Sequence, residues 1–240
     1  MNLNKFLASA ALAESFGLAG PVSAAVVQVQ YRGTVSSGYD TTGVFGSAGS
    51  FLDGLAYTAS YTFETTYGHT LSSSYYNYAY GGGVLSMPSP VLSSTVTING
   101  NTVAVPGSWN GQISGYNDGI YSHQSHQSQE YSYNISSYRD NNSYNYIYNY
   151  NGTLPASITA PFSYAVTEGD TAEGFVQIRQ YTLDSTGYTH SADAYAYLIP
   201  DHVTISAPIP EPETYALLLA GLGLLGFAAR RRKLEEVAAV

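Results

Sequence analysis

The sequence predicts an all-β fold: a single antiparallel β-sandwich, flanked by an N-terminal signal peptide and a C-terminal transmembrane helix. Three observations favour the sandwich. Apolar and polar residues alternate with a period of two at both ends of the central region, no stretch there has the 3.6-residue period of a core helix, and turn residues separate the alternating segments. Residues 26–207, called the body below, are numerous enough to enclose one substantial core, so we expect a single domain.

The alternating segments define the expected strands. They lie at 27–35, 56–63, 94–98, 102–105, 174–181 and 192–199. Asn99-Gly100 separates the third segment from the fourth, and this pair of residues is typical of a two-residue hairpin turn. Ser185-Thr186-Gly187 indicates another turn, between the last two strands.

Residues 1–25 have the pattern of a secretory signal peptide. Lys5 supplies the positive charge, residues 6–13 the apolar core, and residues 22–25 a cleavage site of small side chains. The chain contains no cysteine, so a disulfide scaffold, thiol catalysis and a thiolate metal site are excluded.

The body is acidic. Its only basic residues besides histidine are Arg32, Arg139 and Arg179, against twelve Asp or Glu. A surface of this charge repels phosphate groups, so nucleic acid and anionic membranes are disfavoured as partners.

The C-terminal region, residues 208–240, has three parts. Pro210-Glu211-Pro212 is stiff and extended, because each proline fixes its own φ and keeps the preceding residue out of the helical region. The apolar run at 215–229 predicts a transmembrane helix of about 22 Å, and arginine snorkelling covers the rest of the roughly 30 Å hydrocarbon core. The run ends at a membrane stop that stays cytoplasmic, Arg230, Arg231, Arg232 and Lys233. This topology places the body outside the cytoplasm.

This region has two other interpretations. The glycines at 221–226 fit the dinucleotide pattern G-x-G-x-x-G, but that pattern needs a preceding strand and a βαβ unit, and the chain is almost at its end. The second alternative is a plain membrane anchor that is never processed, whose glycines and alanines simply permit close helix packing.

The order of the three parts resembles the PEP-CTERM sorting signal of Gram-negative bacteria. The resemblance implies recognition of Pro210-Glu211-Pro212 by a membrane peptidase of the exosortase family, a transient anchor in the inner membrane, and release to the cell surface or beyond. Residues 31–68, with the segments 38–46 and Leu52-Asp53-Gly54, resemble a module of other PEP-CTERM proteins of unknown function. That second resemblance implies a shared sandwich fold and no assigned activity.

Acidic residues close to glycines are candidate calcium ligands, since Ca²⁺ favours carboxylates and backbone carbonyl oxygens. They are Asp40, Asp53, Glu168 and Asp170. The alternative is that they hydrogen-bond the backbone of tight turns, and residues 167–174 are expected to form an exposed hairpin turn. No cofactor other than such a calcium ion is expected.

Residues 114–152 are rich in tyrosine, asparagine, serine and glutamine. Alternating tyrosines in this region are candidate glycan contacts, because their rings stack on sugar faces while the amides bond hydroxyl groups: Tyr144, Tyr146, Tyr148 and Tyr150. Two alternatives stay open. The same alternation describes an ordinary strand, and polar-aromatic segments of low charge also favour cross-β self-association.

Catalytic patterns are scarce. His123-Gln124-Ser125-His126, with Glu130 beyond, has a loose metal-ligand spacing, but its polar surroundings favour a solvated loop. The chain has no G-x-S-x-G elbow and no H-E-x-x-H helix, so we expect no enzyme.

The sequence therefore predicts an exported structural or adhesive protein of the extracellular matrix or biofilm, with exopolysaccharide as a candidate partner. A secreted carbohydrate-binding module is the alternative, and a secreted hydrolase the third hypothesis. The matrix setting comes from the resemblance alone.

Overall fold

The structure, a computed structural model, describes residues 26–185, 187–206 and 219–223. Residues Ala25–Pro210 form one compact unit, and the prediction of an all-β body is confirmed. The strands are β1 (Val26–Asp40), β2 (Ser50–Phe51), β3 (Ala56–Glu64), β4 (His69–Ser72), β5 (Tyr76–Gly81), β6 (Val91–Ile98), β7 (Asn101–Ala104), β8 (Asn110–Asn117), β9 (Ser122–Asn134), β10 (Ser137–Asn149), β11 (Phe162–Ala165), β12 (Thr171–Asp184) and β13 (Gly187–Ile205), with one 3₁₀ turn, η1 (Gly83–Leu85).

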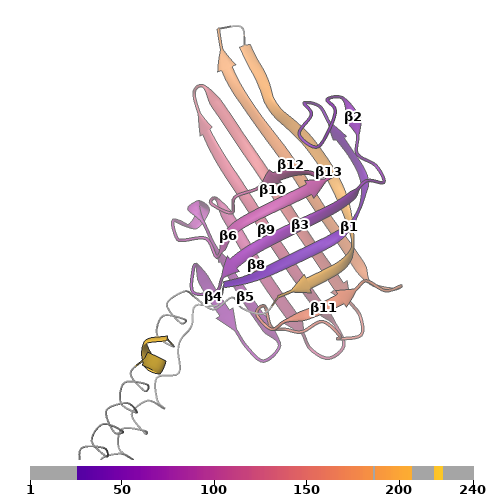
Figure 1. Cartoon of the computed structure of the whole chain (residues 1–240), viewed down its shortest axis with the longest axis vertical. Helices are drawn as coiled ribbons and strands as arrows, with labels where there is room; N and C mark the ends of the chain where they lie inside the picture. The colour runs from indigo at the N-terminus through magenta and orange to yellow at the C-terminus, as the bar shows by residue number, and fades with distance from the viewer. Residues whose placement is uncertain (1–25, 186, 207–218, 224–240) are drawn as a thin grey trace, which may run out of the picture. The chain divides into compact units, whose positions relative to one another are not determined.

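The two layers of the sandwich are parts of one antiparallel sheet. Its strand order is β4-β5-β8-β9-β10-β12-β13-β1-β3-β6-β7, with β2 added to β1 and β11 to β13. The sheet folds over on itself, so that β1, β3 and β6 lie across β8, β9 and β10 (Figure 1). The bend runs through the β1–β13 pair, where the register shifts at Arg32/Gly33 and at Val35/Ser37. Bulges of this kind bend a strand and increase its twist.

All six predicted strands are present, and most are longer than predicted. The hairpin at Asn99-Gly100 is also confirmed: β6 and β7 pair from Ile98↔Asn101 onward. Asn99 and Gly100 have φ values of 52° and 79°, in the left-handed region that a tight two-residue turn requires. Local turn chemistry therefore sets this pairing.

The layer of β1, β3 and β6 supplies most of the bulk of the core. Its inward residues are large and fully or almost fully buried, among them Val29, Tyr31, Tyr61, Phe63 and Ile98. The opposite layer contributes aliphatic side chains, among them Ile113, Ile147, Ile178 and Leu198, and small ones such as Ala79 and Ala194. Among the described strands, the buried aromatic rings therefore come from β1 and β3.

The inward face of β9 and β10 is mostly polar. Its buried residues are Ser122, Gln124, His126 and Ser128 on β9, and Asn141, Ser143, Asn145 and Asn149 on β10. Tyrosine hydroxyls from the facing layer satisfy several of them. The Tyr57 hydroxyl donates to Asn145 Oδ1 at 2.9 Å, and the Asn145 amide donates to the Tyr61 hydroxyl at 2.9 Å. Buried polar groups are tolerated when they are paired in this way.

The prediction of a solvated loop at His123-Gln124-Ser125-His126 is wrong. These residues lie in β9, a central strand, and His126 is completely buried. The Tyr31 hydroxyl and His126 Nδ1 lie 2.7 Å apart, and Gln124 Nε2 donates to the carbonyl of Pro155 at 2.6 Å. Partners distant in sequence thus bond one polar atom of each of these two side chains, whereas Gln124 Oε1 and His126 Nε2 are buried without a partner.

Some predicted features lie outside the described residues. They are the signal peptide at 1–25, the Pro210-Glu211-Pro212 triplet and the basic residues at 230–233. The predicted transmembrane helix at 215–229 is described only at 219–223, which is helical. Across the described parts of the chain, no helix has the length and apolarity needed to cross a membrane.

Candidate functional site

The predicted glycan-contact tyrosines of β10 point away from the core. Tyr144, Tyr146 and Tyr148 are partly exposed, and they alternate with the buried residues Ser143, Asn145 and Ile147. Because side chains alternate along a strand, all three tyrosines share the outer face of the sheet. Tyr150 lies just beyond the end of β10, 58% exposed, with its ring 5.8 Å from that of Tyr121.

These tyrosines belong to a continuous run of rings that crosses the outer face of the sheet. Consecutive rings in the run have centroids 4.8–6.5 Å apart, within the usual range for aromatic pairs. We call this run the aromatic face. Its members are His69 on β4, Tyr80, Tyr78 and Tyr76 on β5, Tyr116 on β8, His123 on β9, Tyr148, Tyr146 and Tyr144 on β10, Phe175 on β12, and Tyr197 and Tyr195 on β13.

Strand register holds the rings in place. Tyr116 pairs with His123, and His123 pairs with Tyr148. Further along the sheet, Tyr144 pairs with Phe175, which in turn pairs with Tyr197. Directly paired residues in antiparallel strands lie on the same side of a sheet, so the ladder fixes the rings without any loop. The strand register, and not a loop, therefore sets the positions of these rings.

Amide side chains lie beside the rings on the same face. The Tyr78 hydroxyl donates to Gln112 Oε1 at 2.9 Å, and Gln112 Nε2 donates to Asn110 Oδ1 at 3.1 Å. On β9, Gln127 and Gln129 pair in register with Tyr144 and Asn142 of β10. The surface thus combines flat apolar rings with hydrogen-bond donors and acceptors that carry no charge.

One hollow of about 310 Å³ lies where β10, β12, β13 and β1 meet on this face. The rings of Tyr144 and Tyr197 line it, together with Ser36, Ser37 and Glu173. The Tyr146 hydroxyl donates to Glu173 Oε2, and burial together with this carboxylate raises the pKa of Tyr146. Tyr146 therefore stays a neutral donor over the physiological range of pH.

The aromatic face carries little positive charge. Burial lowers the pKa of His123, so its ring is neutral at pH 7. Arg179 of β12 pairs in register with Asp140 on one side and with Asp193 on the other. Arg179, which lies on the same side of the sheet as the rings, is thus flanked by two carboxylates.

The predicted calcium ligands fall into two separate places. Asp40 is the last residue of β1 and pairs with Ala194 of β13. Asp170 lies in the turn after β11, close to Asp201 of β13, whose carbonyl accepts a hydrogen bond from Val166 N. About seven residues of β13, roughly 24 Å, separate the two places. Asp53 belongs to the first place, since its Oδ1 accepts from Gly38 N at 2.8 Å, and the exposed Glu168 belongs to the second.

Protein donors already surround the best buried of these carboxylates. Both oxygens of Asp40 accept backbone N–H bonds, from Gly43, Val44 and Phe45, at 2.7–2.8 Å. Asp170 accepts from Tyr164, Thr167 and Asn149. Burial acts to raise the pKa of Asp170, but these hydrogen bonds lower it below its ordinary value. Among the residues described, no three His, Cys, Asp or Glu side chains gather closely enough to hold a metal ion. The calcium site stays a prediction.

The turn at 167–170 is present: Asp170 N donates to the Thr167 carbonyl at 3.1 Å, and Gly169 has a φ of 93°. It is not the turn of a hairpin, because the strands on either side of it, β11 and β12, both pair with β13. The expected hairpin is therefore wrong in its pairing.

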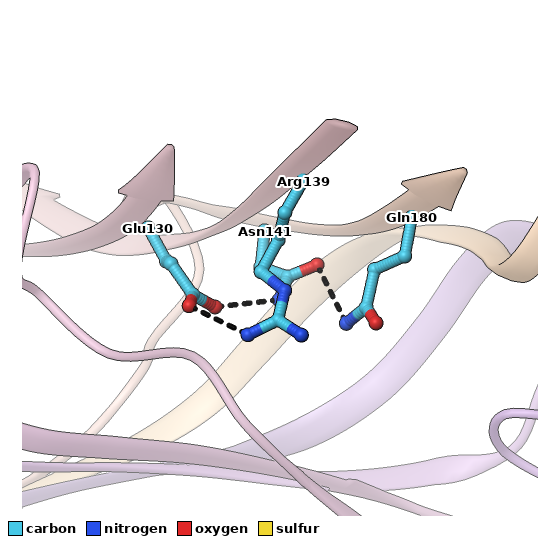
Figure 2. Close-up of polar contacts among 4 residues, drawn as sticks. All are labelled: Glu130, Arg139, Asn141 and Gln180. Carbon is cyan, nitrogen blue, oxygen red and sulfur yellow. Dashed lines mark hydrogen bonds and ion pairs between the residues drawn. The ribbon is translucent and has the colours of Figure 1, made fainter. Parts of the chain in front are cut away.

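A second polar cluster lies at the other end of β9 and β10, on the inward side. Glu130 accepts from Arg139 Nη1 at 2.9 Å and from Asn141 Nδ2 at 2.9 Å, and Gln180 Nε2 donates to Asn141 Oδ1 at 3.5 Å (Figure 2). It ties β9, β10 and β12 together where their hairpins extend past β1, β3 and β6 (Figure 1). We interpret this cluster as a structural one, which neutralises the charge of Arg139.

Residues 208–233 match the PEP-CTERM protein-sorting motif. The chain carries a PEP-CTERM sorting signal. This motif indicates an exported protein with a membrane-anchored precursor, sorted by an exosortase. No curated protein matches the chain in sequence. The resemblance of residues 31–68 to other PEP-CTERM proteins stays a prediction.

Sequence reasoning missed most of the aromatic face. It identified the tyrosines of β10 but not His69, His123, Phe175 or the tyrosines of β5, β8 and β13. A signal was present: Tyr76-Asn77-Tyr78-Ala79-Tyr80 and Tyr195-Ala196-Tyr197 both alternate tyrosine with a small or polar residue. Only the strand register reveals that these segments meet on one surface.

Proposed function

We propose that the exported body is an adhesive protein that binds polysaccharide through its aromatic face. The observation that carries this proposal is the continuous run of partly exposed rings from β4 to β13, bordered by neutral amides. Pyranose rings present flat C–H faces that pack on aromatic rings and hydroxyl groups that bond to amides, so this combination suits a sugar ligand.

The size and position of the surface support an adhesive role. Tyr195 and Tyr197 are 44% and 51% exposed, although their ring centroids lie only 6.3 Å apart. Extensive exposed apolar surface on a secreted protein is typically a binding site. The export that the PEP-CTERM motif indicates supports a ligand outside the cytoplasm, and we propose exopolysaccharide as that ligand, at the cell surface or in the extracellular matrix.

The proposal is binding without turnover. Glycoside hydrolysis needs two carboxyl groups on either side of the scissile bond, about 5–9.5 Å apart. Glu173 is the carboxylate in the hollow. The carboxylates Asp140 and Asp193 pair in register with Arg179, which lies six residues further along β12 than Glu173. Six strand residues span about 20 Å, too far for those acids to act together with Glu173.

The test compares ring-removal variants for retention on insoluble polysaccharides. In the full-length protein, purified in mild detergent, Tyr144→Ala combined with Tyr197→Ala removes both rings of the hollow. We expect retention to fall at least about tenfold, because aromatic anchors at binding surfaces contribute roughly 1–2 kcal/mol each. Tyr67→Ala is the matched control, since Tyr67 is 43% exposed in the turn after β3.

Circular dichroism separates loss of binding from loss of folding. If the double variant keeps its strand spectrum and its melting temperature within a few degrees, lost retention reports on binding. Undiminished retention of a folded double variant would refute the proposal. So would an equal loss in Tyr67→Ala, because that outcome indicates non-specific adhesion.

A further inference from the structure

We propose that the ligand of the aromatic face is an extended, uncharged polysaccharide rather than an acidic one. This inference rests on the proposed function and specifies its substrate class. It follows from the charges on the face and from the path of the rings.

The body has three arginines. Arg139 is ion-paired with Glu130 on the inward side of the sheet. Arg32 is exposed on β1, in register with Thr58 of β3 and His202 of β13, and lies four to five strand positions, about 13–17 Å, from Ser36 and Ser37 of the hollow. Arg179 is on the side of the rings, but Asp140 and Asp193 flank it. None of the three arginines places an uncompensated cation beside the hollow, where it would pair with a bound uronate or sulfate.

The carboxylate in the hollow strengthens this preference. Glu173 lines the same space as Tyr144 and Tyr197, where a sugar ring would stack. A neutral sugar can donate its hydroxyl hydrogens to this carboxylate. An acidic sugar in the same position would bring two negative charges together without a counter-ion, which penalises binding.

The path of the rings indicates a long chain. From Tyr195 on β13 to the tyrosines of β5, the run crosses six neighbouring strands: β13, β12, β10, β9, β8 and β5. Five steps between strands, at about 4.8 Å each, make about 24 Å. This distance corresponds to several consecutive sugar units, so a single sugar would contact only a small part of the face.

The test measures binding to polymer pairs that share a backbone and differ in charge. The first pair is hydroxyethylcellulose and carboxymethylcellulose, and the second is highly methyl-esterified pectin and polygalacturonate. Full-length protein in mild detergent and EDTA is run through native gels that contain each polymer. For at least one pair, the neutral polymer should retard the protein in the gel at a polymer concentration about tenfold lower than its charged counterpart does. Added salt should narrow the difference, because it screens repulsion.

A substitution checks the origin of the difference. Glu173→Gln should improve binding to the charged polymer and so reduce the difference in binding between the neutral and the charged polymer. Glu64→Gln, a change on β3 in the other layer, should leave this difference unchanged. A disaccharide should compete far more weakly than its parent polymer.

The outcomes separate the two proposals. Equal or tighter binding to the charged member of every pair, or competition by the disaccharide equal to that of the polymer, overturns this inference and leaves polysaccharide binding intact. Binding to no polymer overturns both. Light scattering that detects a dimer lost in the Tyr144→Ala, Tyr197→Ala variant also overturns both, since a second copy would then cover the face.

Discussion

Acid should destabilise the body through one buried histidine. His126 is completely buried, with the rings of Tyr31, Tyr61 and Phe63 5.5–6.0 Å away, and burial lowers its pKa from 6.5 to about 3. The unfolded chain binds a proton near pH 6.5 and the folded chain only near pH 3. Stability that is complete above pH 6.5 is therefore lost as the pH falls toward 3.

The magnitude follows from the pKa difference. Each pH unit in this window costs about 1.4 kcal/mol, so the full shift is worth about 5 kcal/mol. Between pH 7.5 and pH 4.5 the expected loss is about 3 kcal/mol, because titration begins near pH 6.5. His126→Gln removes the titrating group, although its lower stability at neutral pH reflects lost packing and a changed hydrogen bond with Tyr31.

The assay is urea unfolding of residues 26–207 at both pH values, followed by circular dichroism and by the fluorescence of the single tryptophan, Trp109. The free energy of unfolding should fall by about 3 kcal/mol more in the wild type than in His126→Gln. His69→Gln, a change at an exposed ring, should behave as the wild type does. The same pH dependence in the wild type and in His126→Gln would refute the reasoning.

Two further predictions concern the turn after β1 and the C-terminal region. Asp40→Ala leaves three backbone N–H groups without their acceptor, so thermal unfolding should show a loss of stability of about 3 kcal/mol. Added Ca²⁺ should not change the melting temperature of the wild type. A clear rise in that temperature would instead identify a calcium site. Replacing Pro210-Glu211-Pro212 with alanines should leave the full-length protein in the inner membrane. Mass spectrometry of the released wild-type protein should detect no peptides from residues 230–240. The presence of such peptides would indicate an anchor that is not processed.

The parts of the fold that sequence reasoning predicted are those set locally. Asn99-Gly100 determines a hairpin because its two residues accept positive φ, and no distant contact is needed. The strand β9 could not be predicted in the same way. Its inward residues are polar, and the hydrogen-bond partner of the buried His126 Nδ1 is Tyr31, 95 positions earlier in the chain.

The candidate site was partly predictable for the same reason. Alternation in β10 correctly placed Tyr144, Tyr146 and Tyr148 on one face, but it could not decide which face points inward. The usual assumption is that the aromatic residues do. Here the inward side is the asparagine and serine side, because Tyr57 and Tyr61 of β3 supply it with hydrogen-bonding partners.

This inversion bears on function. Burying the β10 tyrosines and exposing Ser143 and Asn145 would place more apolar area in the core, which generally favours folding. The chain has the opposite arrangement. Ser143 and Asn145 are buried and hydrogen-bond to the hydroxyl of Tyr61, which is itself buried, and burying these polar groups costs free energy. Stability alone does not account for moving large rings to the surface on β5, β8, β10 and β13 together. The ligand that we propose would account for it, because its binding would recover the apolar burial that folding left unused.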